Sequence, residues 1–340
     1  MPSKPVASVC PVVAPESVRP FNSRANRSPV SPANVAVGKF CYAHPRMRAA
    51  AILGLGCSSK NLNPFQSDSS VEWRLGMPAS HDDADAVLLF GGDGTVHRHL
   101  GSLVRVGLPV LVVPAGSGND FACSVGLRRV RDSLAAWRKF CGGKRNVRTI
   151  DLGTISALQG ADVSAPRYFC CVAGVGLDGE VARRANRLPR WLRGHGGYLL
   201  SLAPTIFSFA AQPMKIRTPS ESGENGENWS TRSDRPTLLA AFANTPFYGG
   251  GMKIAPQAKV DDGLLDVCAV GAVARVRLLR LAPTVYSGRH LGVPEVEYFQ
   301  AARARVETEP PLDVYADGEY VCRTPVEVGV HAASLKIITP

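Results

Sequence analysis

The sequence predicts an α/β domain followed by a β-sandwich-like domain. Three observations lead to this fold class. Between residues 47 and 150, strand-like apolar runs alternate with helical patterns, and Gly-rich turns follow the strands. Beyond residue 151, short β-rich runs are separated by Gly, Pro and Asp. With 340 residues, of which 45% are hydrophobic, the chain is long enough to build two cores.

The first predicted domain spans residues 47–150. Its predicted strands are residues 50–55, 86–90 and 108–113. Its predicted helices are residues 96–106, 120–125 and 130–140. A strand, a Gly-rich turn and a helix in repeated order indicate a parallel sheet covered by helices.

The second predicted domain spans residues 151–340 and is rich in β-structure. Its predicted strands are residues 167–172, 214–217, 236–244, 264–270, 295–308 and 313–322. Helical patterns interrupt them at residues 179–187, 198–211 and 273–286. Residues 219–235 are polar and are expected to form the loop at a hairpin tip. This punctuation is typical of an antiparallel sandwich.

Residues 1–46 are predicted to be a disordered N-terminal extension. They hold eight of the 26 prolines, many serines and no periodic apolar pattern. The first 48 residues also carry +6 of the formal net charge of +11. The remaining +5 does not indicate a nucleic-acid partner, and it is compatible with a surface that faces anionic lipid or a nucleotide.

The cysteines and the apolar runs bear on the cell compartment. Nine cysteines, with no C-x-x-C pair, are typical of a reduced cytoplasmic protein. The longest apolar stretch, residues 198–211, is too short to span a bilayer, and no secretory signal opens the chain. We therefore expect a cytoplasmic location.

A Gly-rich turn follows the predicted strand 86–90 and consists of Gly91, Gly92, Asp93, Gly94 and Thr95. Glycines let a backbone approach a phosphate closely, and the helix that follows offers unpaired N–H groups to an anion. Asp93 would bind Mg²⁺ or orient a nucleotide, and Thr95 would cap the helix or contact phosphate. The alternative is a tight turn with Thr95 as its cap, because one such turn alone is a weak signal.

A second Gly-rich turn, residues 114–122, follows the next predicted strand and contains Gly116, Ser117, Asn119 and Asp120. Ligands of open α/β sheets bind at the carboxyl ends of the strands, where the two turns would lie side by side. Together they could clamp a triphosphate. The alternative assigns Asn119 and Asp120 to helix capping only.

The pair Gly-Gly-Asp-Gly-Thr and Pro-x-Gly-Ser-x-Asn-Asp-Phe-Ala resembles the diacylglycerol kinase catalytic family, which includes bacterial lipid kinases and the sphingosine and ceramide kinases. The first turn is shared with NAD kinases and phosphofructokinases, whereas the second is more specific. Further similar stretches are residues 149–153, 174–181, 244–258, 259–266 and 316–319, so that the resemblance covers roughly residues 86–340.

The resemblance implies an ATP-dependent lipid kinase that acts on diacylglycerol or a related lipid, with its active site between the ATP-binding and lipid-substrate domains. By the same resemblance, Mg²⁺ is bound by Asp262 and by the backbone carbonyls of Lys259 and Leu264. The alternative for that turn is a type I′ hairpin. Asp317 is the expected general base, with Glu319 beside it. The implied partners are a lipid and the membrane surface, with a homodimer as a further possibility.

One loop departs from the family pattern. The family has an Asn-Pro-x-x-Gly-type loop after its first strand, whereas residues 54–60 here read Gly-Leu-Gly-Cys-Ser-Ser-Lys. Ser58, Ser59 and Lys60 would replace the missing phosphate contacts. Two other functions remain open: an NAD-kinase-like enzyme with a soluble acceptor, and a catalytically degenerate lipid-binding regulatory module.

Two groups of basic side chains can be explained without a functional role, as ordinary residues of the solvent-exposed surface. The arginines between residues 183 and 193 alternate with Leu and Trp, as in a stretch that rests on an anionic membrane, although a solvated arginine face is the commoner case. His97 and His99 lie two positions apart on a predicted helix, so they point to different sides and are expected at the surface.

Overall fold

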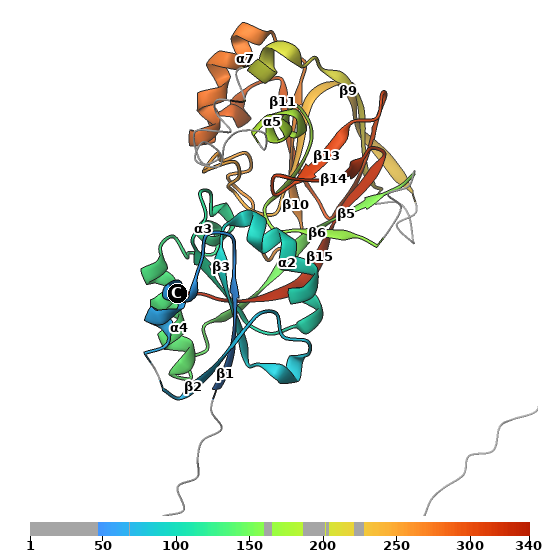
Figure 1. Cartoon of the computed structure of the whole chain (residues 1–340). Helices are drawn as coiled ribbons and strands as arrows, with labels where there is room; N and C mark the ends of the chain where they lie inside the picture. The colour runs from blue at the N-terminus through green and yellow to red at the C-terminus, as the bar shows by residue number, and fades with distance from the viewer. Residues whose placement is uncertain (1–46, 68, 160–164, 186–200, 202–203, 221–227) are drawn as a thin grey trace, which may run out of the picture. The chain divides into compact units, whose positions relative to one another are not determined.

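The computed structural model describes residues 47–67, 69–159, 165–185, 201, 204–220 and 228–340 (Figure 1). The predicted disorder of residues 1–46 lies outside these residues, as do residues 198–200 and 202–203 of the predicted helix 198–211. Contacts among residues 45–340 group them into one compact unit. Within the described part, no helix is long and apolar enough to cross a bilayer.

The first lobe is built on four parallel strands in the order β2-β1-β3-β4. These strands are β1 (Met47–Leu53), β2 (Val71–Leu75), β3 (Ala86–Gly91) and β4 (Val110–Pro114). Every residue of β3 and β4 is buried. Strands covered on both faces have continuous apolar sequences, which is why these two were visible in the sequence.

Helices cover this sheet. They are α1 (Ser59–Leu62), α2 (Asp93–Val106), α3 (Asp120–Ser124) and α4 (Val130–Cys141), with the short 3₁₀ turns η1 (Asn63–Phe65) and η2 (His81–Asp83). On α2, Val96, Leu100, Leu103 and Val106 are buried, and their spacing places one face on the sheet. Each Gly-rich turn begins where β3 or β4 ends, and α2 and α3 start within the turns, so the turns lie at the carboxyl edge of the strands.

The second lobe is mainly antiparallel. Its strands are β5 (Val147–Ala157), β6 (Arg167–Phe169), β7 (Val172–Gly176), β8 (Gln212–Pro219), β9 (Trp229–Ala243), β10 (Leu265–Gly271), β11 (Val296–Ala301), β12 (Arg303–Thr308), β13 (Asp313–Ala316), β14 (Glu319–Arg323) and β15 (Val326–Ile338). Its helical segments include α5 (Leu177–Ala185), α7 (Arg275–Leu281), η4 (Ala282–Ser287) and η5 (Arg289–Gly292). The fold class predicted from the sequence is confirmed.

Two long strands join the lobes. β5 and β15 pair antiparallel from Val326↔Ala157 to Ile338↔Val147, with an irregularity between His331 and Leu335. The end of β15 also pairs with β4 through Ile337↔Val110. The described strands therefore form a single sheet that continues through both lobes.

The structure corrects several predicted elements. β2, β5 and β15 were not predicted as strands. The predicted polar loop 219–235 is shorter, because β9 already begins at Trp229. The predicted helix 273–286 consists of α7 followed by the 3₁₀ segment η4. The predicted strand 295–308 is two strands, β11 and β12.

Candidate active site

The two Gly-rich turns touch each other at glycines. A Cβ atom added at Gly116 would lie 2.4 Å from Gly92 Cα, and one added at Gly92 would lie 2.9 Å from Gly116 Cα. The Ala115 N–H donates to the Gly91 carbonyl at 3.0 Å. A side chain at either glycine would force the turns apart, so the glycines allow this close approach. The predicted neighbouring turns are thus brought together.

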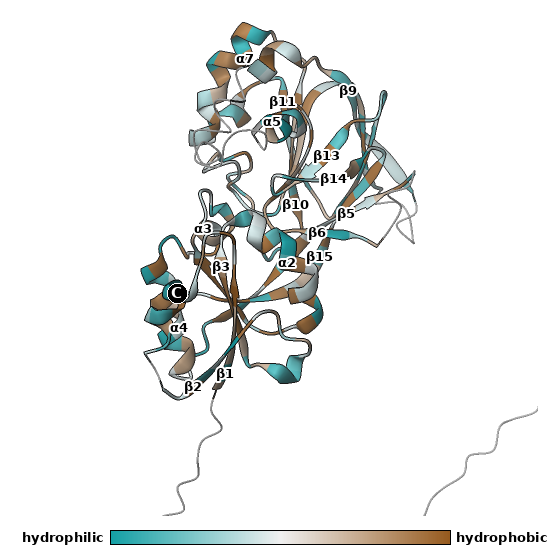
Figure 2. Cartoon of the chain, in the orientation of Figure 1, coloured by the Kyte–Doolittle hydropathy of each residue, from teal (hydrophilic) through white to brown (hydrophobic). Residues whose placement is uncertain are grey.

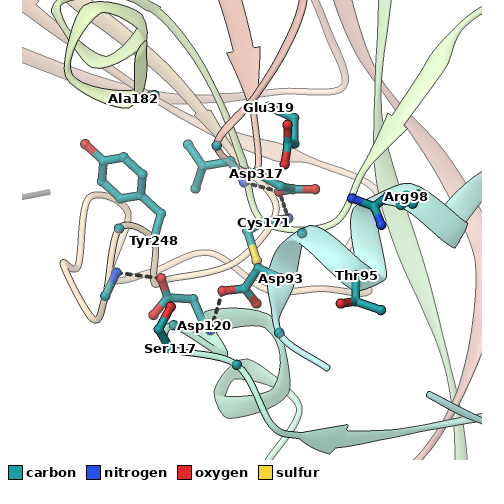
Figure 3. Close-up of a pocket in the computed structure, with 18 of the residues that line it drawn as sticks. Asp93, Thr95, Arg98, Ser117, Asp120, Cys171, Ala182, Tyr248, Asp317 and Glu319 are labelled. Atoms are coloured by element: carbon teal, nitrogen blue, oxygen red, sulfur yellow. Dashed lines mark hydrogen bonds between the residues drawn. The ribbon is translucent and has the colours of Figure 1, made fainter. Parts of the chain in front are cut away.

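Asp93 ties the two turns to each other. Its carboxylate accepts hydrogen bonds from the backbone N–H groups of Asn119, Asp120 and Phe121, each at 3.0 Å. Figure 3 shows the bond from Asp120. Burial, together with the negative charge of Asp120, raises the pKa of Asp93 to about 6 against these N–H donors. At neutral pH the side chain is therefore ionised and holds the N-terminus of α3. The sequence did not reveal this role.

Asn119 and Asp120 brace the second turn in different ways. Asn119 has φ 74°, and its side chain accepts from Gly116 N at 2.9 Å and donates to Gly116 O at 2.8 Å. It thus closes its own turn and makes no side-chain cap on α3. The buried Asp120 accepts from Gly250 N at 2.8 Å. Asp120 therefore connects the turn to the Gly-rich loop 249–251 of the second lobe.

Thr95 packs against the first loop of the chain. A Cβ atom at Gly54 would lie 2.6 Å from Thr95 Oγ1, and one at Gly91 would lie 2.5 Å from it. From this first loop, Leu55 and Gly56 line the cleft described below. Ser58 is instead the N-cap residue of α1, and its N–H donates to Asn61 Oδ1 at 2.9 Å. The loop 54–60, which differs from the family pattern, therefore lies beside the Gly-rich turns. However, the described residues that line the cleft do not include Ser58, Ser59 or Lys60.

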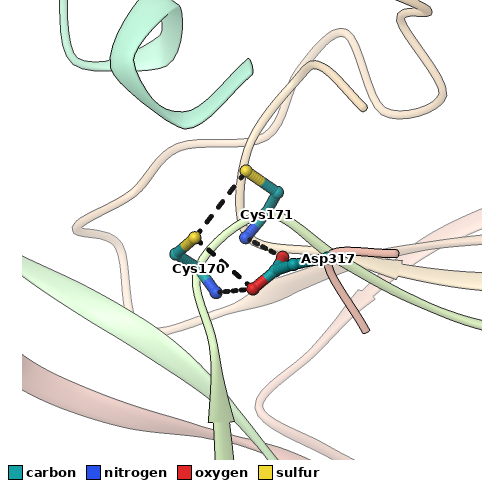
Figure 4. Close-up of side chains that lie close together, drawn as sticks. All are labelled: Cys170, Cys171 and Asp317. Carbon is teal, nitrogen blue, oxygen red and sulfur yellow. Dashed lines mark hydrogen bonds between the residues drawn. The ribbon is translucent and has the colours of Figure 1, made fainter. Parts of the chain in front are cut away.

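The side chain of Asp317 is fully buried in the turn between β13 and β14. Its carboxylate accepts from the backbone N–H groups of Cys170, Cys171 and Val172 at 2.9, 2.8 and 3.3 Å. Figure 4 shows the bonds from Cys170 and Cys171. The His97 imidazole Nδ1 lies 3.0 Å from its Oδ2. Burial raises the pKa of Asp317, but His97 and the N–H donors outweigh that effect, so the pKa falls below its usual value.

His97 corrects the sequence analysis, which placed it at the surface. Its side chain, on α2, is 17% exposed and joins the first lobe to the turn of Asp317. Burial lowers the pKa of His97, whereas its hydrogen bond to Asp317 and the charges of Asp317 and Glu319 raise it; the net shift is upward. Its partner lies 220 positions away in the chain, so no local pattern could have indicated this pair.

Glu319 has a different environment from Asp317. It is exposed, it begins β14, and its Oε1 would lie 3.5 Å from a Cβ atom placed on Gly94. The structure thus brings Glu319 to the first Gly-rich turn. The exposed Arg98 on α2 also borders this cleft, and sequence reasoning missed it.

The acidic side chains and the Gly-rich turns described above line one cleft of about 570 Å³ (Figure 3). Among the described residues that line it, five are acidic and one is basic: Asp93, Asp120, Asp178, Asp317, Glu319 and Arg98. The lining also includes Gly92, Gly94, Thr95, Gly116 and Ser117 of the two turns. A nucleotide polyphosphate would need a divalent cation in such an acidic cleft, and carboxylate oxygens suit Mg²⁺.

A smaller apolar cavity of about 90 Å³ adjoins the cleft. Asp178 and Tyr248 line both spaces. The rest of its lining is almost entirely aliphatic and includes Val181, Ile206, Leu238, Met252, Leu278 and Leu281. This cavity could not be predicted from the sequence, because its walls come from five separate segments.

The residues expected to bind a metal lie in the turn that precedes β10. Leu264 N–H donates to Asp262 Oδ1 at 3.1 Å, and the Asp262 side chain is exposed. No strand of the described chain ends directly before this turn, so the hairpin alternative is not what the structure has. An exposed carboxylate beside backbone carbonyls is an all-oxygen donor set, which fits a hard divalent cation. Asp262, Lys259 and Leu264 remain the predicted ligands.

Comparison with known proteins identifies the family. Residues 72–155 match the diacylglycerol kinase catalytic domain, and residues 171–339 match the YegS C-terminal NAD kinase β-sandwich-like domain. A Mycobacterium tuberculosis protein named diacylglycerol kinase is 36% identical over 256 residues, which cover 75% of this chain and 77% of that protein.

Solved structures agree on the fold. A diacylglycerol kinase from Bacillus anthracis has a TM-score of 0.57 at 16% identity, over 87% of this chain and 97% of that one. An NAD kinase from Archaeoglobus fulgidus in complex with ATP has a TM-score of 0.50 at 14% identity, over 86% and 93%. At such identities the likeness concerns the fold alone. With its two family matches and its relative at 36% identity, the chain belongs to the diacylglycerol kinase catalytic-domain family of kinases.

Proposed function

We propose that this chain is a lipid kinase that transfers the γ-phosphate of ATP to a hydroxyl of diacylglycerol or a related lipid. The observation that carries the proposal is the pair of adjoining spaces. The acidic cleft contains the two Gly-rich turns, and the cavity beyond Tyr248 is apolar. An acceptor with a polar hydroxyl and an alkyl body matches both.

The geometry supports Glu319 over Asp317 as the general base. The Asp317 carboxylate is buried and already accepts from three backbone N–H groups and His97. A base needs a free lone pair within reach of the hydroxyl proton. Glu319 is exposed in the same turn and faces Gly94. Asp317 thereby becomes the residue that holds this turn in place.

In the proposed reaction the lipid oxygen attacks the γ-phosphorus as the bond to the β-phosphate oxygen breaks, and ADP leaves. Glu319 takes the hydroxyl proton. The Gly-rich turns, joined by Asp93, present backbone N–H groups to the phosphates, and Arg98 of α2 adds a positive charge. Mg²⁺, when bound, would neutralise phosphate charge among the carboxylates of the cleft. The chain's own part is to hold nucleotide and acceptor in line.

The test is phosphate transfer from labelled ATP to a panel of acceptors in mixed micelles. The panel contains diacylglycerol, ceramide, a sphingoid base, a polyprenol and, as the soluble rival, NAD. We expect Mg²⁺-dependent labelling of a lipid and none of NAD. Labelling of NAD alone would instead support the NAD-kinase-like function. Nucleotide binding without labelling of any acceptor would support the regulatory module.

The apolar cavity favours the lipid over NAD, because a dinucleotide has no alkyl chain to fill it. A lipid acceptor also requires contact with a membrane. We therefore propose that the protein works at the cytoplasmic membrane surface as a peripheral enzyme.

A further inference from the structure

The helix α7 is unusual because none of its residues is buried. Residues 267–294, which include α7, η4 and η5, contain four arginines and no Asp or Glu: Arg275, Arg277, Arg280 and Arg289. An acidic residue, Glu295, follows this segment and bonds Arg277 Nη2 at 3.0 Å. Arg275, Arg280 and Arg289 are exposed. Because residues 267–294 carry four arginines and no acidic residue, this segment has a net positive charge that attracts an anionic surface.

Apolar side chains are exposed on α7, on η4 and on the short segment whose Ile206 lines the same cavity as Leu278 of α7. Val276 on α7 is 61% exposed, and Tyr286 on η4 is 40% exposed. Phe207, on a short helical segment at residues 204–208, is 52% exposed. Figure 2 shows hydrophilic and hydrophobic residues alternating along α7. We call Arg275, Val276, Arg277, Arg280, Tyr286 and Phe207 the α7 surface.

The inner side of the same elements lines the apolar cavity. Leu278 and Leu281 of α7 and Val285 of η4 face that cavity, as does Ile206, the neighbour of Phe207. The cavity in turn adjoins the cleft through Asp178 and Tyr248. One thin layer of structure therefore separates the α7 surface from the space proposed for the alkyl chain.

We propose that the α7 surface docks this chain on an anionic phospholipid bilayer. The inference rests on the proposed function, because it gives the acceptor lipid a route into the apolar cavity that avoids water. The arginines supply attraction to negatively charged headgroups. Val276, Tyr286 and Phe207 supply side chains that can enter the interface. The combination of charge, exposed apolar groups and an apolar cavity behind them fits a lipid surface.

The arginines between residues 183 and 193 are the competing surface. In the described part of that stretch, Arg183 and Arg184 both bond Glu180, at 2.7 Å and 2.9 Å through their Nε atoms. Arginines that are paired in this way attract a membrane less. Arg187, Arg190 and Arg193 lie outside the described residues.

The binding test compares two triple variants of the full chain. The first is Arg275→Gln/Arg277→Gln/Arg280→Gln. The matched control is Arg128→Gln/Arg129→Gln/Arg131→Gln, since these arginines are also exposed and flank an exposed valine, Val130. Sedimentation uses vesicles of phosphatidylcholine with phosphatidylserine. We expect the α7 variant to lose about tenfold or more in partitioning, because each arginine near such a surface contributes substantially, and the loss should shrink as salt rises.

Activity separates docking from the kinase function itself. With a short-chain diacylglycerol below its micellar concentration, the α7 variant should match the wild type, whereas with a long-chain one in the same vesicles its rate should fall in step with binding. Unchanged binding, or an equal loss in the control, overturns the proposal. Loss of turnover with the short-chain acceptor would overturn it too, because α7 would then belong to the acceptor site. If the wild type binds through α7 but phosphorylates no lipid, the proposed function fails and docking stands.

Discussion

Two acidic residues in one turn have opposite environments. Asp317 is fully buried and surrounded by donors, whereas Glu319 is exposed to the cleft. A buried carboxylate stays ionised only where hydrogen-bond donors or positive charges replace the lost water. The donors around Asp317 do so. Its lone pairs are therefore committed to structure. Glu319 keeps lone pairs available for a proton. Of the two carboxylates, Asp317 therefore stabilises the turn and Glu319 is the proposed base.

This division predicts different consequences for two conservative variants. Glu319→Gln should lower kcat by about 10²–10⁴-fold, the usual cost of losing a general base, with an unchanged melting temperature. Asp317→Asn would place an amide NH₂ against backbone donors and His97, and it should lower the free energy of unfolding by about 3 kcal/mol or more. Urea denaturation and lipid phosphorylation, measured on both variants, check this. An active Glu319→Gln beside a stably folded, inactive Asp317→Asn would restore Asp317 as the base.

The His97–Asp317 pair predicts a pH-dependent contribution to stability. Since the fold raises the pKa of His97, its protonated form is favoured in the folded state. The stabilisation is therefore complete below the ordinary histidine pKa of about 6.5 and is lost as pH rises through the higher folded value. Because the pKa of Asp317 is lowered in the folded state, its contribution to the free energy of unfolding persists down to acidic pH. It is lost only as pH falls through that lowered pKa.

The measurement is the difference in unfolding free energy between wild type and His97→Gln across roughly pH 5 to 9. We expect this difference to be largest at the acidic end and to shrink towards pH 9. His99→Gln is the control, because burial and the charge of Arg98 lower the pKa of His99. A difference that grows with pH would mean that His97 is neutral in the fold.

At the scale of elements, contact between the two Gly-rich turns defines the nucleotide side of the cleft. Gly116→Ala would place a Cβ atom 2.4 Å from Gly92 Cα, so that one turn must move. We expect the KM for ATP to rise and the melting temperature to fall. The control is Gly101→Ala on the exposed face of α2, where a Cβ atom meets nothing within 4 Å. That change should stabilise the protein by about 0.5–1 kcal/mol. Equal ATP affinity in both variants would contradict the close contact.

The elements also show what the sequence could predict. β3 and β4 were visible because they are buried on both faces, and their Gly-rich turns were visible because strand, turn and helix follow one another locally. The first half of β9 was taken for a loop, since Ser230, Thr231 and Arg232 are exposed and lack an apolar alternation. β5 was not predicted as a strand, because its partner β15 lies at the other end of the chain.

The candidate site was predictable in the same local sense. Residues of the two turns were found from their spacing, and the structure brings them together with Glu319 in the cleft. The tasks of Asp93, Asp317 and His97 were not predictable, because they depend on partners 26 to 220 positions away. Metal ligation by Asp262, Lys259 and Leu264 stays a prediction.

At the scale of the whole molecule, one sheet serves both lobes. β5 begins in the first lobe and runs into the second, and its antiparallel partner β15 runs back and ends in the first lobe, where it pairs with β4. Asp151 reinforces the irregularity in this pair by accepting from Ala333 N at 2.7 Å and from Gly263 N at 2.8 Å. If β5 and β15 separated in one lobe, the hydrogen-bonded strand pair that continues into the other lobe would be disrupted as well.

This continuity predicts that the two lobes unfold together. Calorimetry should show one transition with equal calorimetric and van't Hoff enthalpies, the signature of two-state unfolding. Mg-ATP should move that entire transition upward, since a ligand of the folded state stabilises everything that unfolds with it. Asp151→Asn should lower the single melting temperature without dividing the transition. Two resolved transitions, of which nucleotide moves only one, would show that the β5–β15 pair separates before either lobe unfolds.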